Sequence, residues 1–189
     1  MAKICVYCGS STGSDPDFAA AARTVGSSIA RGGHELFYGG GDVGLMGIVA
    51  NAVLEGGGKV TGVITELLME KEVAHRGLSE LVVVPSMHER KAKMLSLADC
   101  FIALPGATGT LEEIIEAFVW TQLDIHRKVC GLLDVNGFYQ HLVRFLGVMC
   151  ESRLMKESQL SQLVVSSDAG QIVEEVLAAE IEPVDKWLG

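Results

Sequence analysis

The sequence predicts an α/β protein, a doubly wound parallel sheet of the Rossmann-like kind with helices on both faces. Two observations carry this prediction. Short apolar runs alternate with segments of helical periodicity along the chain, which is typical of parallel strands joined by crossover helices. The 189 residues are also 49% hydrophobic with 22 glycines and only 6% aromatic side chains. This composition suits strands rich in small and β-branched residues that are covered by helices.

The individual elements can be placed along the chain in order. The apolar runs give expected strands at residues 4–7, 35–38, 59–64, 81–84, 100–103, 129–133 and 163–165. Apolar residues at helical spacing give expected helices near 15–31, 43–55, 87–98, 110–123, 138–151 and 169–179. The first helix has the clearest limits, because Asp15 is a favourable N-cap before Pro16, and Gly32 and Gly33 form a C-terminal stop.

The pattern contains no linker, repeat or low-complexity tract. We therefore expect residues 1–189 to form a single nucleotide-binding α/β domain with a sizeable core. The turns at residues 9–11, 39–41 and 105–110 all follow expected strands. The carboxyl ends of parallel strands share one edge of a sheet, where ligands bind at a topological switch point. The turns are thus expected to converge on one nucleotide-sized site.

Composition argues against several classes of protein. A formal net charge of −9 argues against general nucleic-acid binding, which needs a basic face. No uninterrupted apolar run approaches the roughly 18 residues of a membrane span. A strand begins at once, which leaves no room for a signal peptide and predicts a cytoplasmic protein. Five cysteines, among them Cys5 and Cys8 without a second pair, indicate buried thiols rather than a zinc site. The histidines show no metal-ligand spacing, so no metal site is expected.

The most informative segment is residues 104–113, with the sequence Leu-Pro-Gly-Ala-Thr-Gly-Thr-Leu-Glu-Glu. It lies between an apolar run and a helical pattern that includes Ile114 and Phe118. Backbone N–H groups of such a turn point at the space above the helix N-terminus, and the helix dipole favours an anion such as phosphate there. Glu112 and Glu113 follow within the first helical turn. The segment therefore indicates chemistry on a phosphorylated small molecule.

This segment resembles the PGGxGTxxE signature of the LOG ("lonely guy") family, whose members were historically labelled lysine decarboxylases. Residues 38–47, 87–91 and 117–126 also match the family, in order and separation, within a resemblance that runs from about residue 3 to residue 133. Ala107 stands where the signature has its second glycine, and its methyl group restricts positive φ. Thr108 stands where the family often has an aromatic residue, and Val119 where plant members have a substrate-contacting threonine.

The resemblance implies a homodimeric hydrolase, without a cofactor, that cleaves the N-glycosidic bond of purine nucleoside 5′-monophosphates such as AMP and cytokinin ribotides. It implies that Arg90 and Glu113 are catalytic. It also implies a set of substrate contacts at Gly40, Gly41, Glu72, Lys91, Gly106, Ala107, Thr108, Gly109, Thr110, Leu111 and Glu112.

The residue types suit these roles. A guanidinium binds phosphate or ribose oxygens in a bidentate manner. A carboxylate near the anomeric carbon can stabilise an oxocarbenium-like ribose or activate water, by analogy with glycoside hydrolysis. A mean hydropathy of +0.33 is high for a soluble monomer of this size, which favours a homodimer that shares apolar helix surface.

Other interpretations of the same residues stay open at this point. Gly39, Gly41 and Gly44 match G-x-G-x-x-G, with Glu66 lying 22 residues beyond Gly44, as in dinucleotide-binding proteins. That motif normally follows the first strand, however, and here it follows the second. Thr110 and Glu113 have capping-box spacing, which would give both a structural role without catalysis.

Two further functions compete with the hydrolase. A non-catalytic nucleotide or cofactor carrier could use the same phosphate-binding turn. A lysine decarboxylase would need a lysine that forms a Schiff base with pyridoxal phosphate, and no lysine of the chain stands out for that role.

Overall fold

The computed structural model describes residues 1–71 and 73–182. Parallel strands form one seven-stranded sheet in the order β4-β3-β2-β1-β5-β6-β7. The strands are β1 Lys3–Tyr7, β2 Glu35–Tyr38, β3 Lys59–Thr65, β4 Glu80–Val84, β5 Cys100–Ala103, β6 Cys130–Leu133 and β7 Leu163–Ser166. The doubly wound parallel sheet expected from the sequence is confirmed.

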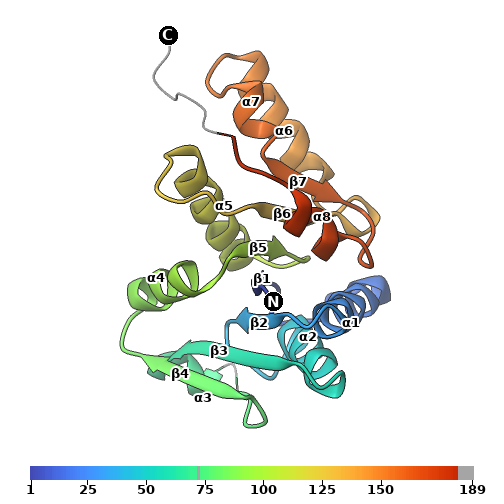
Figure 1. Ribbon diagram of the computed structural model, residues 1–189, viewed down its shortest axis with the longest axis vertical. Coiled ribbons are helices and arrows are strands. Elements are labelled where there is room, and N and C mark those ends of the chain that lie inside the picture. The colour runs from blue at the N-terminus through green and yellow to red at the C-terminus, as the bar shows by residue number, and fades with distance from the viewer. Residues whose placement is uncertain (72, 183–189) are drawn as a thin grey trace.

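Helices connect the strands and cover both faces of the sheet. They are α1 Pro16–Arg31, α2 Gly44–Glu55, α3 Glu66–Lys71, α4 Met87–Leu97, α5 Thr108–Gln122, α6 Gln140–Glu151, α7 Glu157–Leu160 and α8 Ile172–Ala178, with a 3-10 turn η1 at Val135–Gly137. In Figure 1, α1, α2 and α8 lie to the right of the strands, and α4 and α5 lie to the left. No helix in the described ranges is long and apolar enough to cross a membrane.

Side chains along β1 point alternately to the two faces of the sheet, so this one strand contributes to the apolar cluster on each face. Ile4 and Val6 belong to the apolar cluster under α1, α2 and α8, while Cys5 and Tyr7 belong to the cluster under α4, α5 and α6. Successive side chains of a strand point to opposite faces, so a strand buried on both sides is apolar at every position. All of these residues are at most 3% exposed.

The middle of the sheet contains the switch in winding direction. β1 pairs with β2 on one side, where Ile4 lies opposite Leu36, and with β5 on the other, where Ile4 lies opposite Cys100. The chain winds outward from β1 to β4 and then returns to place β5 on the other side of β1. The chain after β1 leads to α1 on one face of the sheet, and the chain after β5 leads to α5 on the other face. The ends of these two strands form the switch point, where doubly wound proteins bind ligands.

The predicted first residues of several helices were wrong. α5 begins at Thr108 rather than at residue 110, α6 at Gln140 rather than 138, and α8 at Ile172 rather than 169. The short helices α3 and α7 were not predicted. The predicted start of α1 is confirmed, because the Asp17 N–H donates to Asp15 Oδ1 at 2.9 Å and Pro16 occupies the first turn.

Candidate functional site

The loops that follow β1 and β5 meet at the switch point through main-chain hydrogen bonds. The Gly9 N–H donates to Pro105 O at 3.1 Å, and the Leu45 N–H at the start of α2 donates to Gly9 O at 3.0 Å. A pocket of about 150 Å³ opens there. It is lined by Val6, Tyr7, Cys8, Gly9, Ser10, Gly39, Met46, Arg90, Ala107, Gly109, Thr110 and Glu113. The turns at residues 9–11, 39–41 and 105–110 were expected to converge, and each of them contributes residues to this lining.

Arg90 is held in the pocket wall by the main chain of β3 and of the turn that follows β2. It lies in the first turns of α4, after Ser86, whose Oγ accepts from the Glu89 N–H at 3.2 Å and caps the helix. The Arg90 side chain is 7% exposed. Its Nε donates to Val63 O in β3 at 2.9 Å, and its Nη2 donates to Gly39 O after β2 at 3.3 Å. These bonds fix the plane of the guanidinium.

Gly39 is required at this position because the guanidinium lies directly against it. A Cβ built on Gly39 would stand 2.3 Å from Arg90 Nη2. Any side chain here would therefore displace the arginine. The G-x-G-x-x-G match is thus explained at its first position by the packing of Arg90, and it follows β2 rather than the central strand β1.

Glu113 faces Arg90 in the pocket wall. It lies in the second turn of α5, its side chain is 13% exposed, and its Oε1 is 3.7 Å from Arg90 Nη1. Burial raises the pKa of Tyr7, and the Cys5 thiol and the Glu113 carboxylate nearby raise this pKa further. The phenol of Tyr7 is thus neutral in the pocket wall. An arginine and a glutamate face each other in a half-enclosed space.

The start of α5 is the part of the pocket whose geometry suits an anion. Ala107 is the N-cap residue, and the Leu111 N–H makes the first helical bond, to Ala107 O at 3.1 Å. The N–H groups of Thr108, Gly109 and Thr110 precede that bond, and the first N–H groups of a helix have no acceptor within it. They can therefore bind an anion, favoured by the helix dipole.

The capping-box interpretation of Thr110 and Glu113 is wrong. Because α5 begins at Thr108, both residues lie inside the helix, and the cap is the main chain of Ala107 without a side-chain hydrogen bond. Ala107 has φ −91°, which alanine adopts without strain, so this turn does not need the second glycine of the signature. Thr110 is 5% exposed and packs against Gly106, where an added Cβ would lie 2.2 Å from Thr110 Oγ1.

Other residues singled out by the sequence lie around this pocket rather than in it. Lys91 contacts α5, with its Nζ bound to a Glu112 carboxylate oxygen and 3.2 Å from Glu116 Oε1. Thr108 and Leu111 line an apolar groove between α5 and α6. The substrate contacts expected at these residues stay predictions.

The predicted substrate contacts after β2 and β3 are placed as follows. Gly40 and Gly41 are buried, and Gly40 has φ +81° and packs against β3, where an added Cβ would lie 3.2 Å from Ile64 Cβ. Glu72 lies outside the described residues.

Sequence reasoning missed part of the lining, namely Val6, Tyr7, Cys8 and Met46. These residues stand at the end of the central strand and at the start of α2. Because ligands bind at the switch point, this position could have indicated that they line the pocket.

The fold and the pocket define a Rossmann-like protein in which a helix N-terminus and a facing arginine and glutamate line a pocket at the switch point. The chain belongs to the LOG family. Residues 46–176 match the family model described as "Possible lysine decarboxylase". A cytokinin riboside 5′-monophosphate phosphoribohydrolase of Arabidopsis thaliana is 43% identical over 93% of this chain and 77% of its own length. The LOG enzyme of that name from Oryza sativa subsp. japonica is 43% identical over 90% of this chain and 71% of its own.

Solved structures of lower identity share the fold. The molybdenum cofactor carrier protein of Chlamydomonas reinhardtii superposes with a TM-score of 0.72 at 20% identity, covering 94% of this chain and 99% of its own. The molybdenum cofactor binding protein of Rippkaea orientalis gives a TM-score of 0.66 at 19% identity, covering 94% of this chain and 96% of its own.

Proposed function

We propose that the protein is a phosphoribohydrolase that cleaves the N-glycosidic bond of purine nucleoside 5′-monophosphates, AMP or its N6-substituted forms, to the free base and ribose 5-phosphate. One observation carries the proposal: Arg90 and Glu113 face each other beside the N-terminus of α5. A 5′-phosphate at that N-terminus would bring the attached ribose into the pocket beside the two side chains. The names of the relatives agree with this reaction.

In the proposed reaction the bond between the anomeric carbon and the purine nitrogen breaks as positive charge develops on the ribose. The carboxylate of Glu113 stabilises that charge and accepts a proton from the attacking water. The water oxygen bonds to the anomeric carbon as the carbon–nitrogen bond breaks. The base leaves with one proton, which balances the proton that Glu113 takes from water, and transfer of this proton returns Glu113 to its ionised form. The Arg90 guanidinium keeps donors on Nη1 and Nη2 for ribose or phosphate oxygens, while Nε is used by Val63 O. The phosphate supplies binding energy that orients the sugar.

The test compares AMP with adenosine at equal concentrations of pure protein, with release of adenine as the measured quantity. AMP should be cleaved with a kcat/KM at least about 10²-fold higher, because adenosine lacks the group that the helix N-terminus binds. Comparable values for the two substrates would mean that the start of α5 does not bind phosphate. Binding of AMP without release of adenine would favour the non-catalytic carrier. A panel of N6-substituted ribotides then identifies the preferred base.

Lysine decarboxylation, the reaction named in the family description, does not fit this pocket. A decarboxylase of that kind needs a lysine that forms a Schiff base with pyridoxal phosphate. The described residues that line the pocket include no lysine, and the Lys91 ammonium is bound by Glu112 and Glu116.

We also propose that two copies of the chain associate through α5 and α6. An apolar groove of about 480 Å³ lies between these helices, lined mainly by Leu, Ile, Phe and Met side chains. Phe145, which lines the groove, is 57% exposed, and Val148 on the same helix is 44% exposed. Large apolar patches of this kind mark interaction surfaces. Because the groove begins at Thr108 and Leu111, the second copy would lie beside the phosphate-binding turn.

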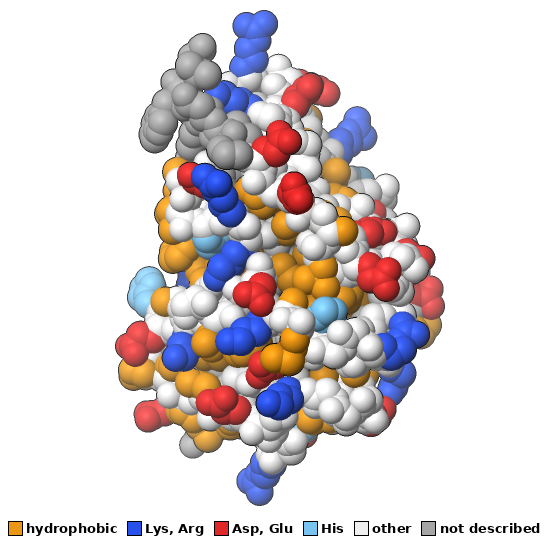
Figure 2. Space-filling view, in the orientation of Figure 1, with side chains coloured by type: hydrophobic (Ala, Val, Ile, Leu, Met, Phe, Trp, Pro, Cys, Tyr) orange, Lys and Arg blue, Asp and Glu red, His pale blue; other side chains and the backbone are white. Residues whose placement is uncertain are grey.

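A cytoplasmic location is part of the proposal. All five cysteines are free, and Cys5, Cys8, Cys100 and Cys130 are buried, as expected in a reducing compartment. Charges of both signs are interspersed on the face in Figure 2, which agrees with a small-molecule substrate rather than nucleic acid.

A further inference from the structure

The segment that follows residue 72 lies beside the turn after β2 and pairs with it. The Asp42 N–H donates to Val73 O at 2.9 Å, and the His75 N–H donates to Gly40 O at 3.0 Å. These bonds surround an antiparallel bridge between Gly41 and Ala74. The turn at residues 40–42 is thereby held from outside the sheet as well as from β3.

His75 anchors this segment by its side chain. The residue is 7% exposed. The Gly77 N–H donates to His75 Nδ1 at 3.0 Å, so Nδ1 carries a lone pair and the ring proton lies on Nε2. His75 Nε2 then donates to Asn51 Oδ1 in α2 at 3.0 Å and lies 3.4 Å from Asp42 Oδ1. One imidazole therefore ties together its own segment, helix α2 and the end of the β2 turn.

The turn held in this way contributes one of the acceptors that orient Arg90. Gly39 O accepts from Arg90 Nη2, and Gly39 directly precedes Gly40, whose carbonyl accepts the His75 N–H. Gly39 also lies in contact range of the guanidinium, so the turn cannot shift without moving the arginine. A shift of about 1 Å in a positioned group is enough to cost roughly 10²-fold in rate.

We propose that His75 is a positioning residue for the reaction: through Asn51 and the turn at residues 40–42 it holds Gly39 O where it orients the Arg90 guanidinium. The proposal rests on the proposed function for its kinetic consequence. It adds a residue outside the pocket lining to the residues on which turnover depends.

The experiment compares His75→Leu, His75→Gln and His75→Asn with the wild-type protein. His75→Leu should lower kcat for AMP by roughly 10- to 100-fold and change KM by less than about threefold, because the phosphate-binding turn is untouched. Glutamine can donate to Asn51 and should restore kcat to within about threefold. Asparagine can accept from Gly77 but is too short to reach Asn51, and it should behave like leucine.

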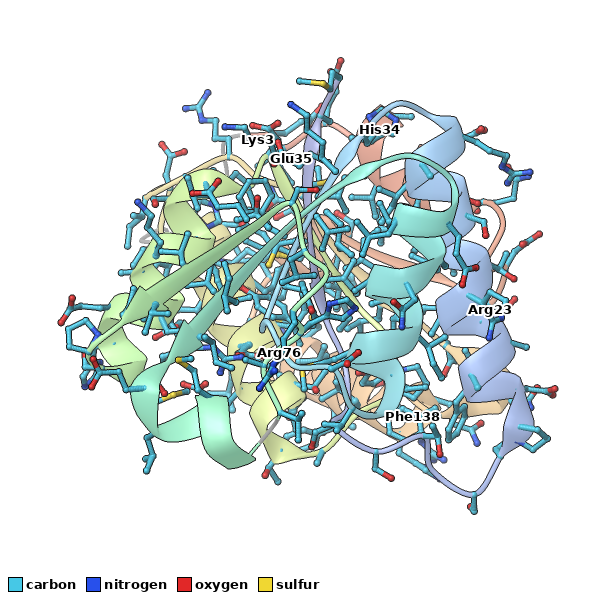
Figure 3. The ribbon with its side chains drawn as sticks, turned by 90° about the horizontal axis from the view of Figure 1, so that it is seen from below. Lys3, Arg23, His34, Glu35, Arg76 and Phe138 are labelled. Carbon is cyan, nitrogen blue, oxygen red and sulfur yellow. The ribbon has the colours of Figure 1, made fainter. Side chains whose placement is uncertain are left out.

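A matched control is His34, whose Nδ1 accepts the Ala2 N–H at 3.1 Å. Figure 3 places His34 with Lys3 and Glu35 at one end of the strands, and Arg76, next to His75, towards the other. His34→Leu should lower the melting temperature without changing kcat. A kcat in His75→Leu within about twofold of wild type, or an equal loss in His34→Leu, would overturn the proposal.

A second measurement keeps the test independent of activity. The Nε–H resonance of Arg90 should be slow to exchange with solvent in the wild-type protein and in His75→Gln, and faster in His75→Leu. If the wild-type protein releases no base from any ribotide, the proposed function fails, and this resonance alone decides the role of His75. An unchanged exchange rate in His75→Leu would contradict that role.

Discussion

The side chains of Arg90 and Glu113 reach the pocket in different ways. Arg90 is bound by main-chain carbonyls of β3 and of the turn that follows β2, and it cannot rotate without losing both bonds. Glu113 stands on a helix and faces the arginine at 3.7 Å, a separation longer than a close ion pair. Arg90 on α4, held against the sheet, and Glu113 on α5 are therefore adjacent in the pocket wall, where a bound ribose would lie beside both, and we expect the largest mutational effects here.

Glu113→Gln tests the carboxylate at constant shape. If its charge stabilises the developing cation or accepts the proton from water, kcat should fall by roughly 10²–10⁴-fold. The melting temperature and the binding of ribose 5-phosphate should change little, since glutamine fills the same space. Glu174→Gln on α8 is the matched control, as it changes the same charge far from the pocket. Turnover close to that of the wild-type protein in Glu113→Gln would remove Glu113 from the mechanism.

The sequence predicted Arg90 and Glu113 as catalytic residues because both stand in segments whose residue order resembles a known family, and the structure brings the two into one pocket. It did not indicate what orients Arg90, because the acceptors are carbonyl groups of Val63 and Gly39, and every residue has a carbonyl. The pairing of Lys91 with Glu112 and Glu116 was equally hidden, since it depends on how α4 and α5 approach each other.

At the scale of elements, the turn that leads into α5 contains a packed glycine, and the first turn of the helix contains an open one. A Cβ on Gly106 would collide with the buried Thr110, whereas a Cβ on Gly109 would meet no heavy atom within 4 Å. The first glycine thus holds the turn against the helix. The second leaves space above the N–H groups that are proposed to bind phosphate.

These two glycines should respond in opposite ways to alanine. Gly106→Ala should destabilise the fold by roughly 1–3 kcal/mol through overpacking, which thermal unfolding can measure. Gly109→Ala should unfold at the same temperature as the wild-type protein or slightly higher, because alanine is the better helix former. Its methyl group should nevertheless raise the KM for AMP by about tenfold or more. An unchanged KM in Gly109→Ala would place the phosphate elsewhere.

The succession of strands and long helices along the chain could be predicted from hydrophobic periodicity, but the short helices and the exact helix starts could not. α3 follows β3 without a turn residue between Thr65 and Glu66, and it is too short to show a helical period. The start of α5 was misplaced because Thr110 looks like a cap, whereas the main chain of Ala107 provides the cap. Local side-chain preference was overruled there by the packing of Thr110 under Gly106.

At the scale of the whole molecule, the groove between α5 and α6 predicts the oligomeric state. Phe145→Glu should convert a dimer to a monomer at micromolar concentration, because a charge would be buried in the shared apolar surface. Light scattering measures the mass directly. Leu67→Glu on α3 is the control, since Leu67 is 68% exposed on a different helix. A wild-type protein that scatters as a monomer would contradict the homodimer.

The buried thiols predict how stability depends on alkaline pH. Burial raises the pKa of Cys100 and of Cys130 from 9.0 to about 12. Above pH 9 the unfolded chain therefore releases these protons while the folded protein keeps them, so the free energy of unfolding falls as the pH rises towards 12. The melting temperature should decrease steadily between about pH 9 and 11. A Cys100→Ala and Cys130→Ala double variant should show a shallower decrease, and an identical slope would assign the effect to other groups.

The central place of β1 also bears on how the protein reaches its native state. β1 pairs with β2 across about thirty residues of chain and with β5 across nearly a hundred, and the Lys3 N–H donates to Asp99 Oδ2 at 2.8 Å with a separation of 96 residues. Contacts so distant in sequence slow folding, because a long loop must close before they form. During synthesis β1 is made first but cannot pair with β5 until residue 103 has been made. The pocket cannot be completed until Glu113 has left the ribosome, and the sheet cannot be completed until Ser166 has left it. A pulse of hydrogen exchange during refolding should accordingly find the amides of β1 and β5 protected together and late.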